Sequence, residues 1–145
     1  MVTEPADQLS DNALFLLRRA EASVRAAADD LLAPTLLTLS QYFVLRLIRS
    51  TPGSSSADLA RLYGVSPRAM TGLLSTLESV GLVERRDHPS HRRIKLVFLT
   101  NDGERRARTA ERQIDRFERE LAPRHGQEAV QTWLERCAST SRRGT

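Results

Sequence analysis

A run of basic residues over 84–95 is the part of this sequence whose chemistry is easiest to name. The segment ERRDHPSHRRIK carries five basic and two acidic residues, a local net charge of +3 in a chain whose net charge is +4. A guanidinium group can fork onto a phosphate or a guanine edge, so clustered arginines are typical of nucleic-acid contacts. Arginine richness can equally reflect genomic composition, because Lys95 is the only lysine among 22 basic residues. The position of the charge, more than its amount, therefore favours a nucleic-acid surface.

The residues before this segment have the pattern of a helix that fits the major groove of DNA. Ser66 is a good N-cap and Pro67 a favourable first helical residue, so a helix is expected to begin there. Its core face is expected to hold Met70, Leu73, Leu74, Leu77 and Val80. Its opposite face holds Arg68, Ala69, Thr71, Gly72, Ser75 and Thr76. These residues are small or polar, as close approach to bases requires, and Arg68 is the candidate base reader; an ordinary solvated face explains the others equally well.

A shorter helix is predicted just upstream, which makes the pair a helix-turn-helix. Ser55 and Asp58 form a capping-box-like pair at its start. Gly64 is placed where the helix must end in a left-handed conformation, which glycine adopts without steric cost. The residues expected to face inward are Leu59, Ala60 and Leu62.

A β-hairpin is predicted directly after the helix-turn-helix. Gly81 ends the second helix, and strands are expected over 82–86 and 94–99. In the second strand, one face is expected to hold Ile94, Leu96 and Phe98. Arg92 and Arg93 lie at the tip, where arginine can enter a narrow minor groove. His88 and His91 are spaced like metal ligands, but without a nearby cysteine or third ligand a solvated wing is the better interpretation.

Amphipathic helices are expected on both sides of this central segment. They are predicted over 9–31, 39–48 and 101–121, with a short final helix over 130–137. Their apolar faces exceed what a small winged helix can cover, so they either fold back on the same chain as a bundle or pair in a two-fold dimer, which we favour. The residues expected at the dimer contact are Leu9, Ala13, Leu16, Ala107, Ala110, Ile114, Phe117, Leu121, Trp133 and Leu134.

Composition sets bounds on the class of protein. With 145 residues and 40% hydrophobic content, the chain can bury one core. We expect a cytoplasmic protein, because the start MVTEPADQ lacks the features of a signal peptide and no apolar run is long enough to span a bilayer. The single cysteine, Cys137, fits a reducing compartment. An enzyme is disfavoured because the sequence has no glycine-rich phosphate loop, no Cys/His pair placed for nucleophilic catalysis and no set of carboxylates on an apolar background.

The sequence resembles the MarR family of bacterial transcription regulators over nearly its whole length. The motifs that carry the resemblance are TxxQYxxL from Thr38, SADLARLYGVSPRAMTGLLSTLESVGLVER over 56–85, PSHRR from Pro89 and LTNDG from Leu99. The resemblance implies a winged-helix homodimer on a palindromic operator. We therefore expect a mainly α (α+β) winged helix-turn-helix as one structural domain. Its parts are an N-terminal dimerisation helix in 1–36, a DNA-binding region in 37–100 with recognition helix 66–80 and wing 84–99, and C-terminal dimerisation helices in 101–145.

The resemblance also raises points of detail about the wing and about ligands. Where the family wing has an aspartate that orients an arginine, this chain has His91. A neutral imidazole could accept a hydrogen bond from Arg93, and its protonation would increase phosphate attraction as the pH falls.

Family members are often switched by small phenolic or other aromatic ligands, for which the candidate residues are Tyr42, Phe43, Arg46 and Tyr63. For these aromatics, core packing is the preferred interpretation. Cys137 is interpreted as packing, with an intersubunit disulfide as the lesser alternative.

We therefore expect a sequence-specific DNA-binding regulator of the repressor type, acting as a homodimer without catalysis, cofactor or metal. A winged helix used only for protein contacts is the alternative function. The candidate DNA contacts are Ser66, Pro67, Arg68, Thr71, Gly72, Ser75, Thr76, Arg85, Arg92 and Arg93. The expected partners are an operator duplex, a second copy of the chain and a small aromatic or phenolic effector.

Overall fold

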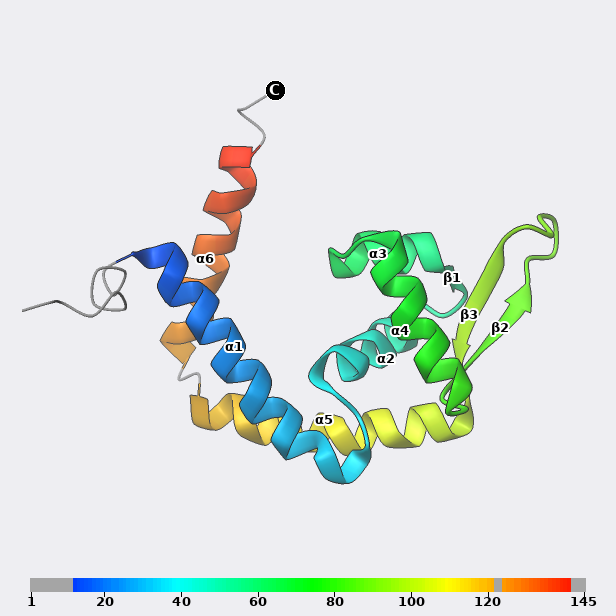
Figure 1. The fold of residues 1–145 in the computed structure, drawn as a ribbon, viewed down its shortest axis with the longest axis horizontal. Helices are drawn as coiled ribbons and strands as arrows, with labels where there is room; N and C mark the ends of the chain where they lie inside the picture. Colours follow the sequence, from blue (N-terminus) through cyan, green and yellow to red (C-terminus); the bar gives the residue numbers. More distant parts are fainter. Residues whose placement is uncertain (1–11, 122–123, 142–145) are drawn as a thin grey trace, which may run out of the picture.

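The computed structural model describes residues 12–121 and 124–141 and consists of helices around a small antiparallel sheet (Figure 1). The elements are α1 (Ala13–Leu32), the 3₁₀-helix η2 (Ala33–Thr35), α2 (Leu39–Ser50), β1 (Ser54–Ser55), α3 (Ser56–Tyr63), α4 (Pro67–Ser79), β2 (Val83–Asp87), β3 (Lys95–Leu99), α5 (Asn101–Leu121) and α6 (Arg124–Ser141). The sheet order is β1-β3-β2. In the β2–β3 hairpin Val83 pairs with Leu99 and Asp87 with Lys95. The hairpin forms a wing at the far end of α5 from α6 (Figure 1). This arrangement is the predicted winged helix-turn-helix.

Capping residues determine where the central helices begin and end. Ser55 and Asp58 form the reciprocal capping box at the start of α3, and Gly64 ends α3 with a φ of 76°. The Ser66 side chain accepts a hydrogen bond from the Ala69 N–H, with Pro67 as the first residue of α4. Each of these predictions is confirmed. Local hydrogen bonding therefore sets the turn that places α4 against α3.

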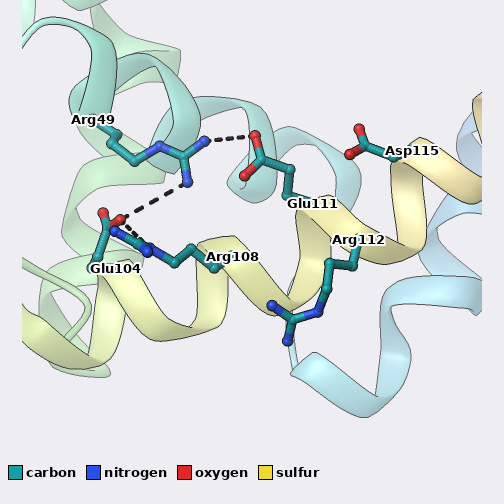
Figure 2. Close-up of a pocket in the computed structure, with 6 residues that line it drawn as sticks. All are labelled: Arg49, Glu104, Arg108, Glu111, Arg112 and Asp115. Atoms are coloured by element: carbon teal, nitrogen blue, oxygen red, sulfur yellow. Dashed lines mark hydrogen bonds and ion pairs between the residues drawn. The ribbon is translucent and has the colours of Figure 1, made fainter.

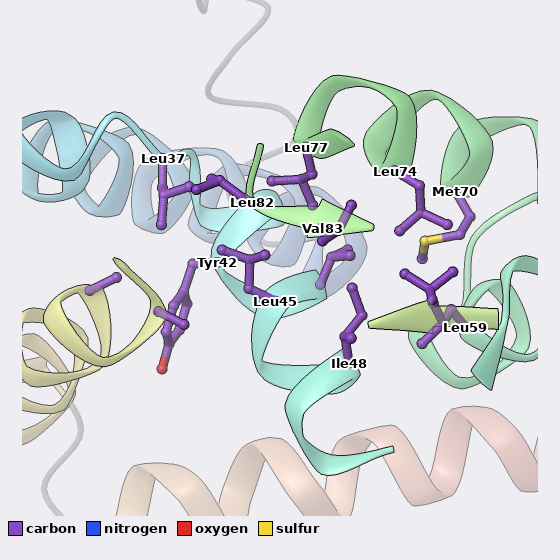
Figure 3. Packing of buried hydrophobic residues seen from close by; sticks show 14 of the residues in the cluster. Leu37, Tyr42, Leu45, Ile48, Leu59, Met70, Leu74, Leu77, Leu82 and Val83 are labelled. Atoms are coloured by element: carbon purple, nitrogen blue, oxygen red, sulfur yellow. The ribbon is translucent and has the colours of Figure 1, made fainter. Parts of the chain in front are cut away.

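The core is centred on α2, and the other elements of the winged helix pack around it (Figure 3). Its largest fully buried side chains include Tyr42, Leu32, Leu45, Ile48, Leu59, Met70, Leu74, Leu77 and Leu82. The described part of the chain has no single helix that is long and apolar enough to span a membrane; α1 and α2 pass such a test only as a pair bent by 71°.

Two of the residues expected in this core are exposed instead. Leu62 is 55% exposed, because the buried side of α3 is formed by Leu59 and Ala60, with Tyr63 partly buried against the same core. Val80 is 53% exposed, because α4 ends at Ser79 and Val80 no longer follows the helical spacing. In β3 the buried residue is Val97, on the opposite face from the predicted Ile94, Leu96 and Phe98 set, of which Leu96 and Phe98 are half-buried and Ile94 is exposed.

The apolar stripe of α5 is covered within the same chain. Ala107, Ala110 and Ile114 are at most 2% exposed and Phe117 packs beside them, because α5 lies against α1 and α2. The prediction that these residues contact a partner chain is therefore wrong for the three buried side chains, and packing within the chain is the better account of this stripe. Leu9, and the side chains of Leu121 and Cys137, lie outside the described residues.

The terminal helices α1 and α6 keep an exposed apolar surface. The exposed large apolar residues on these two helices are Leu14, Leu16, Leu17, Val24, Leu31, Val130, Trp133 and Leu134, which we call the terminal apolar surface. Ala13 is exposed on the same helix as Leu16. Because apolar surface of this extent is rare on a monomer, it points to an interaction site.

A close junction joins the turn after α4 to the start of α5. The Thr100 N–H donates to the Leu82 carbonyl (3.1 Å), and the Thr100 hydroxyl donates to the Gly81 carbonyl (2.7 Å). The same hydroxyl accepts from the Gly103 N–H at 3.0 Å, so Thr100 caps the start of α5. A Cβ at Gly103 would overlap the Leu82 carbonyl oxygen and lie 2.9 Å from its carbonyl carbon. Only glycine allows α5 to approach the turn this closely.

Replacing Gly103 by alanine tests this junction. The added methyl group would push α5 away from Leu82, so we expect Gly103→Ala to lower the free energy of unfolding by about 3 kcal/mol. Gly72→Ala is the matched control, because a Cβ at Gly72 meets nothing within 4 Å and should raise stability by about 0.5 to 1 kcal/mol. Urea unfolding of both variants measures the difference. Equal stability of the two would contradict the close approach.

Candidate nucleic-acid interface

The solvent face of α4 has the composition that the sequence predicts. Its candidate contacts are all exposed, namely Ser66, Pro67, Arg68, Thr71, Gly72, Ser75 and Thr76. The Thr71 hydroxyl donates to the Pro67 carbonyl (2.9 Å) and the Thr76 hydroxyl donates to the Gly72 carbonyl (3.1 Å). Their donors are therefore used within the helix, and the threonine methyl groups remain for contact with thymine methyls. This face offers one positive charge and no acid to a groove.

The wing turn presents two further arginines. Its backbone is closed by the His88 N–H donating to the Ile94 carbonyl (3.1 Å), and Arg92 and Arg93 are exposed. Over the described ranges, neither these two arginines nor Arg68 makes an ion pair or a hydrogen bond through its side chain. Their guanidinium groups are therefore available to phosphates or base edges without first breaking an internal contact.

The histidines of the wing do not orient Arg93. The His91 ring lies 5.0 Å from the His88 ring, centroid to centroid, and Arg93 donates no hydrogen bond to it. The His88 Nδ1 accepts from the Ser90 N–H at 3.1 Å. The expected His91–Arg93 hydrogen bond is therefore absent between these described residues. No group of three His, Cys, Asp or Glu side chains is placed to hold a metal ion among the residues that the structure describes.

Arg85 has a different position from the one expected of a DNA contact. Its side chain is 26% exposed, and its Nε lies 3.2 Å from Glu78 Oε2 on α4. Alternation along β2 places Arg85 on the same face as the buried Val83. The guanidinium group of Arg85 is therefore directed to α4, a contact that the DNA-binding prediction for this residue did not include. The sequence carried one signal for this, since strand alternation from Val83 assigns Arg85 to the inner face.

None of the four candidate ligand residues lines the hollows at Arg49, Pro34 or Gln127. Tyr42 is fully buried, and its hydroxyl accepts a hydrogen bond from Arg46 Nη1 at 3.3 Å. Burial raises the pKa of the Tyr42 hydroxyl, while Arg46 opposes that rise. The Phe43 ring is 5.4 Å from that of Tyr42, and both Phe43 and Tyr63 pack against the core. Core packing therefore accounts for these aromatics in a single chain.

A charged hollow lies instead between α2 and α5 (Figure 2). It has a volume of about 370 Å³ and is lined by Arg49, Glu104, Arg108, Glu111, Arg112 and Asp115. Arg49 Nη2 donates to Glu111 Oε1 at 2.6 Å, and Arg108 Nε donates to Glu104 at 2.7 Å. The hydrogen bond from Arg49 holds the pKa of the Glu111 carboxyl below its ordinary value of 4.5. The Arg49–Glu111 contact links α2, the central helix of the winged helix, to the long helix α5.

The Arg49–Glu111 pair should make stability depend on pH. Because the pKa of Glu111 is lower in the folded state than in the unfolded state, the pair stabilises the fold above about pH 4.5, and this contribution is lost as the pH falls through the folded pKa. We expect Glu111→Gln to cost on the order of 1 kcal/mol at pH 7 and to flatten the acid limb of the stability curve.

The control for this prediction is Glu120→Gln, because Glu120 is 67% exposed and pairs with Arg116 at 3.4 Å on the surface of α5. Chemical unfolding of both variants between pH 7 and 3 measures the effect. An acid limb that is the same for Glu111→Gln and wild type would contradict the role of this pair.

Comparison with known proteins agrees with the geometry of the winged helix. The family model described as MarR family matches residues 37–95. The HTH-type transcriptional repressor Rv2887 of Mycobacterium tuberculosis is 39% identical over 97 residues, which cover 67% of this chain and 70% of that one.

Solved structures extend the similarity to the terminal helices. A transcriptional repressor, CouR, bound to a 23-mer DNA duplex has a TM-score of 0.81 and 27% identity, covering 95% of this chain and 99% of that chain. CouR from Rhodococcus jostii RHA1 bound to p-coumaroyl-CoA has a TM-score of 0.76 and 34% identity, covering 90% of this chain and 94% of that chain. The exposed α4 face and the wing with arginines at its tip thus belong to a fold and a sequence that are similar to those of these repressors. The chain belongs to the MarR family.

Proposed function

We propose that this protein is a homodimeric transcriptional repressor that binds a palindromic operator in the cytoplasm. The observation that carries the proposal is the exposed α4 face beside a wing turn whose Arg92 and Arg93 have no ion-pair partner within the described chain. In this account α4 enters the major groove, with Arg68 at the base edges, and Arg92 and Arg93 enter the adjacent minor groove. The relatives are transcriptional regulators, and we assign no catalytic activity to this chain.

The terminal apolar surface is the proposed dimer contact. It lies on α1 and α6, at the end of α5 opposite to the wing (Figure 1). A two-fold pairing there leaves both α4 faces free, and the helices would meet half-sites about 34 Å apart, one turn of DNA. Because each half-site then contributes to the same binding event, the dimer reads an inverted repeat with far higher affinity than one chain alone.

A small aromatic ligand is the proposed effector. Support comes from the relative that was solved with p-coumaroyl-CoA, an aromatic thioester. The candidate aromatics pack in the core of one chain. In the proposed mechanism, the ligand therefore selects a conformation in which the α2–α5 region opens, or it binds a site to which the second chain of the dimer contributes residues. A conformation that changes the spacing of the two α4 helices would bind the operator less tightly.

Two arginine substitutions test the DNA-binding roles. Arg68→Ala should lose about 10-fold to 100-fold of discrimination between operator and unrelated duplex, because a base contact is removed. Arg93→Ala should weaken both kinds of binding to a similar degree and reduce the salt dependence of binding, because a backbone contact is removed.

Fluorescence anisotropy with both duplexes at several salt concentrations measures these effects. Arg116→Ala, a substitution of an arginine that is 79% exposed on α5, is the control and should change neither. The opposite pattern for Arg68 and Arg93 would reverse the assignment. If the protein has no affinity for any duplex, and binds a protein partner in a way that does not depend on salt, the protein-contact alternative is favoured.

An aspartate in the terminal apolar surface tests dimerisation. Leu16 is 46% exposed on α1, and Leu16→Asp would bury a charge at the proposed contact. We expect the variant to sediment as a monomer at micromolar concentration and to lose operator binding by at least about 100-fold. Leu62→Asp, at a leucine that is 55% exposed on α3, is the matched control for oligomeric state. If Leu16→Asp sediments as wild type does, another surface must form the dimer.

A further inference from the structure

An ion pair joins the recognition helix to the wing. Arg85 Nε on β2 lies 3.2 Å from Glu78 Oε2 in the last turn of α4. Between the end of α4 and the start of β2 are only residues 80–82, with Gly81 in a left-handed conformation (φ 73°). The ion pair lies beyond this turn, one residue before the end of the helix and two residues after the start of the strand. The ion pair is therefore placed to fix the angle between α4 and β2, which would otherwise depend only on the backbone of residues 80–82.

The surroundings of the pair show that each charge needs the other. Arg85 Nε and Nη2 are shielded from solvent and make no hydrogen bond with another described residue, so Glu78 provides their electrostatic compensation. Glu78 is in turn the only acid in α4, and it lies at the negative end of the helix dipole with no basic residue in that turn. A carboxylate there would also repel DNA phosphates. Arg85 offsets both effects.

The opposite face of β2 provides a comparison. Glu84 pairs with Arg86, whose guanidinium carbon lies 4.5 Å from the centroid of the Phe98 ring. These contacts stay within the hairpin and do not reach α4. Glu84 and Glu78 have equally exposed side chains, at 43% each. The two glutamates therefore have the same charge and the same exposure, but only Glu78 connects α4 to the wing.

We propose that Glu78 and Arg85 are positioning residues that set the wing against the recognition helix, so that Arg93 reaches the minor groove while α4 occupies the major groove. Neither residue contacts DNA in this role. The inference rests on the proposed DNA-binding function. It predicts that the energetic value of Arg93 in operator binding depends on the Glu78–Arg85 pair.

The two roles that Glu78 could have in DNA binding predict opposite signs. If Glu78 acted only through its charge, Glu78→Gln would remove a repulsion and tighten binding. If it positions the wing, Glu78→Gln should weaken operator binding about tenfold even though the net charge becomes more positive. The thermal midpoint should stay within a few degrees of wild type, because the side chain is 43% exposed and the replacement keeps its shape.

A double-mutant cycle with Arg93→Ala tests the positioning role directly. The cost of Arg93→Ala should fall from about tenfold in wild type to about twofold in Glu78→Gln, whereas in Glu84→Gln it should stay near tenfold. An unchanged cost of Arg93→Ala in Glu78→Gln, or tighter binding by Glu78→Gln itself, would overturn the inference. If wild type binds no duplex at all, the proposed function fails, which is distinct from a cycle that shows no coupling.

Discussion

The carbonyl groups of Gly81 and Leu82 hold the recognition helix, the wing and α5 at one point. Thr100 donates to both carbonyls and caps α5, and Gly103 lets the helix lie directly against Leu82. Because α5 also covers α2 with Ala107, Ala110 and Ile114, this junction fixes the position of α4 and the wing relative to the core. In the proposed function, a shift of α5 would move α4 and the wing together through these contacts.

The charges of the protein divide into two groups with different roles. Arg49 and Arg85 are partly shielded and paired with Glu111 and Glu78, so they hold elements together. Arg68 and the two arginines of the wing turn have no such partner among the described residues, and in the proposed function their guanidinium groups contact phosphates and bases. A chain with a modest net charge of +4 therefore presents three exposed arginines without an internal partner on α4 and the wing turn, among the described residues.

Local signals made much of the fold predictable, and long-range packing explains the errors. Ser55, Gly64 and Ser66 determine their turns through hydrogen bonds with near neighbours, so their roles can be read from the sequence. The sequence pattern of an apolar stripe such as that of α5 does not determine which surface covers the stripe. In this structure, other helices of the same chain cover it. The role of Arg85 required the distance to Glu78, and the need for glycine at position 103 required the approach of Leu82. Strand alternation assigns Arg85 to the inner face, but neither its contact with Glu78 nor the approach of Leu82 follows from spacing along the chain.

In the proposed complex, two copies of this chain bind one palindrome through paired α4 helices. Selection of bound duplexes from a random pool with the purified protein tests this symmetry. We expect enrichment of an inverted repeat whose half-sites are centred about 10 base pairs apart, with A·T-rich flanks where the wings enter the minor groove. Enrichment of a single half-site without symmetry, or of no sequence at all, would contradict it.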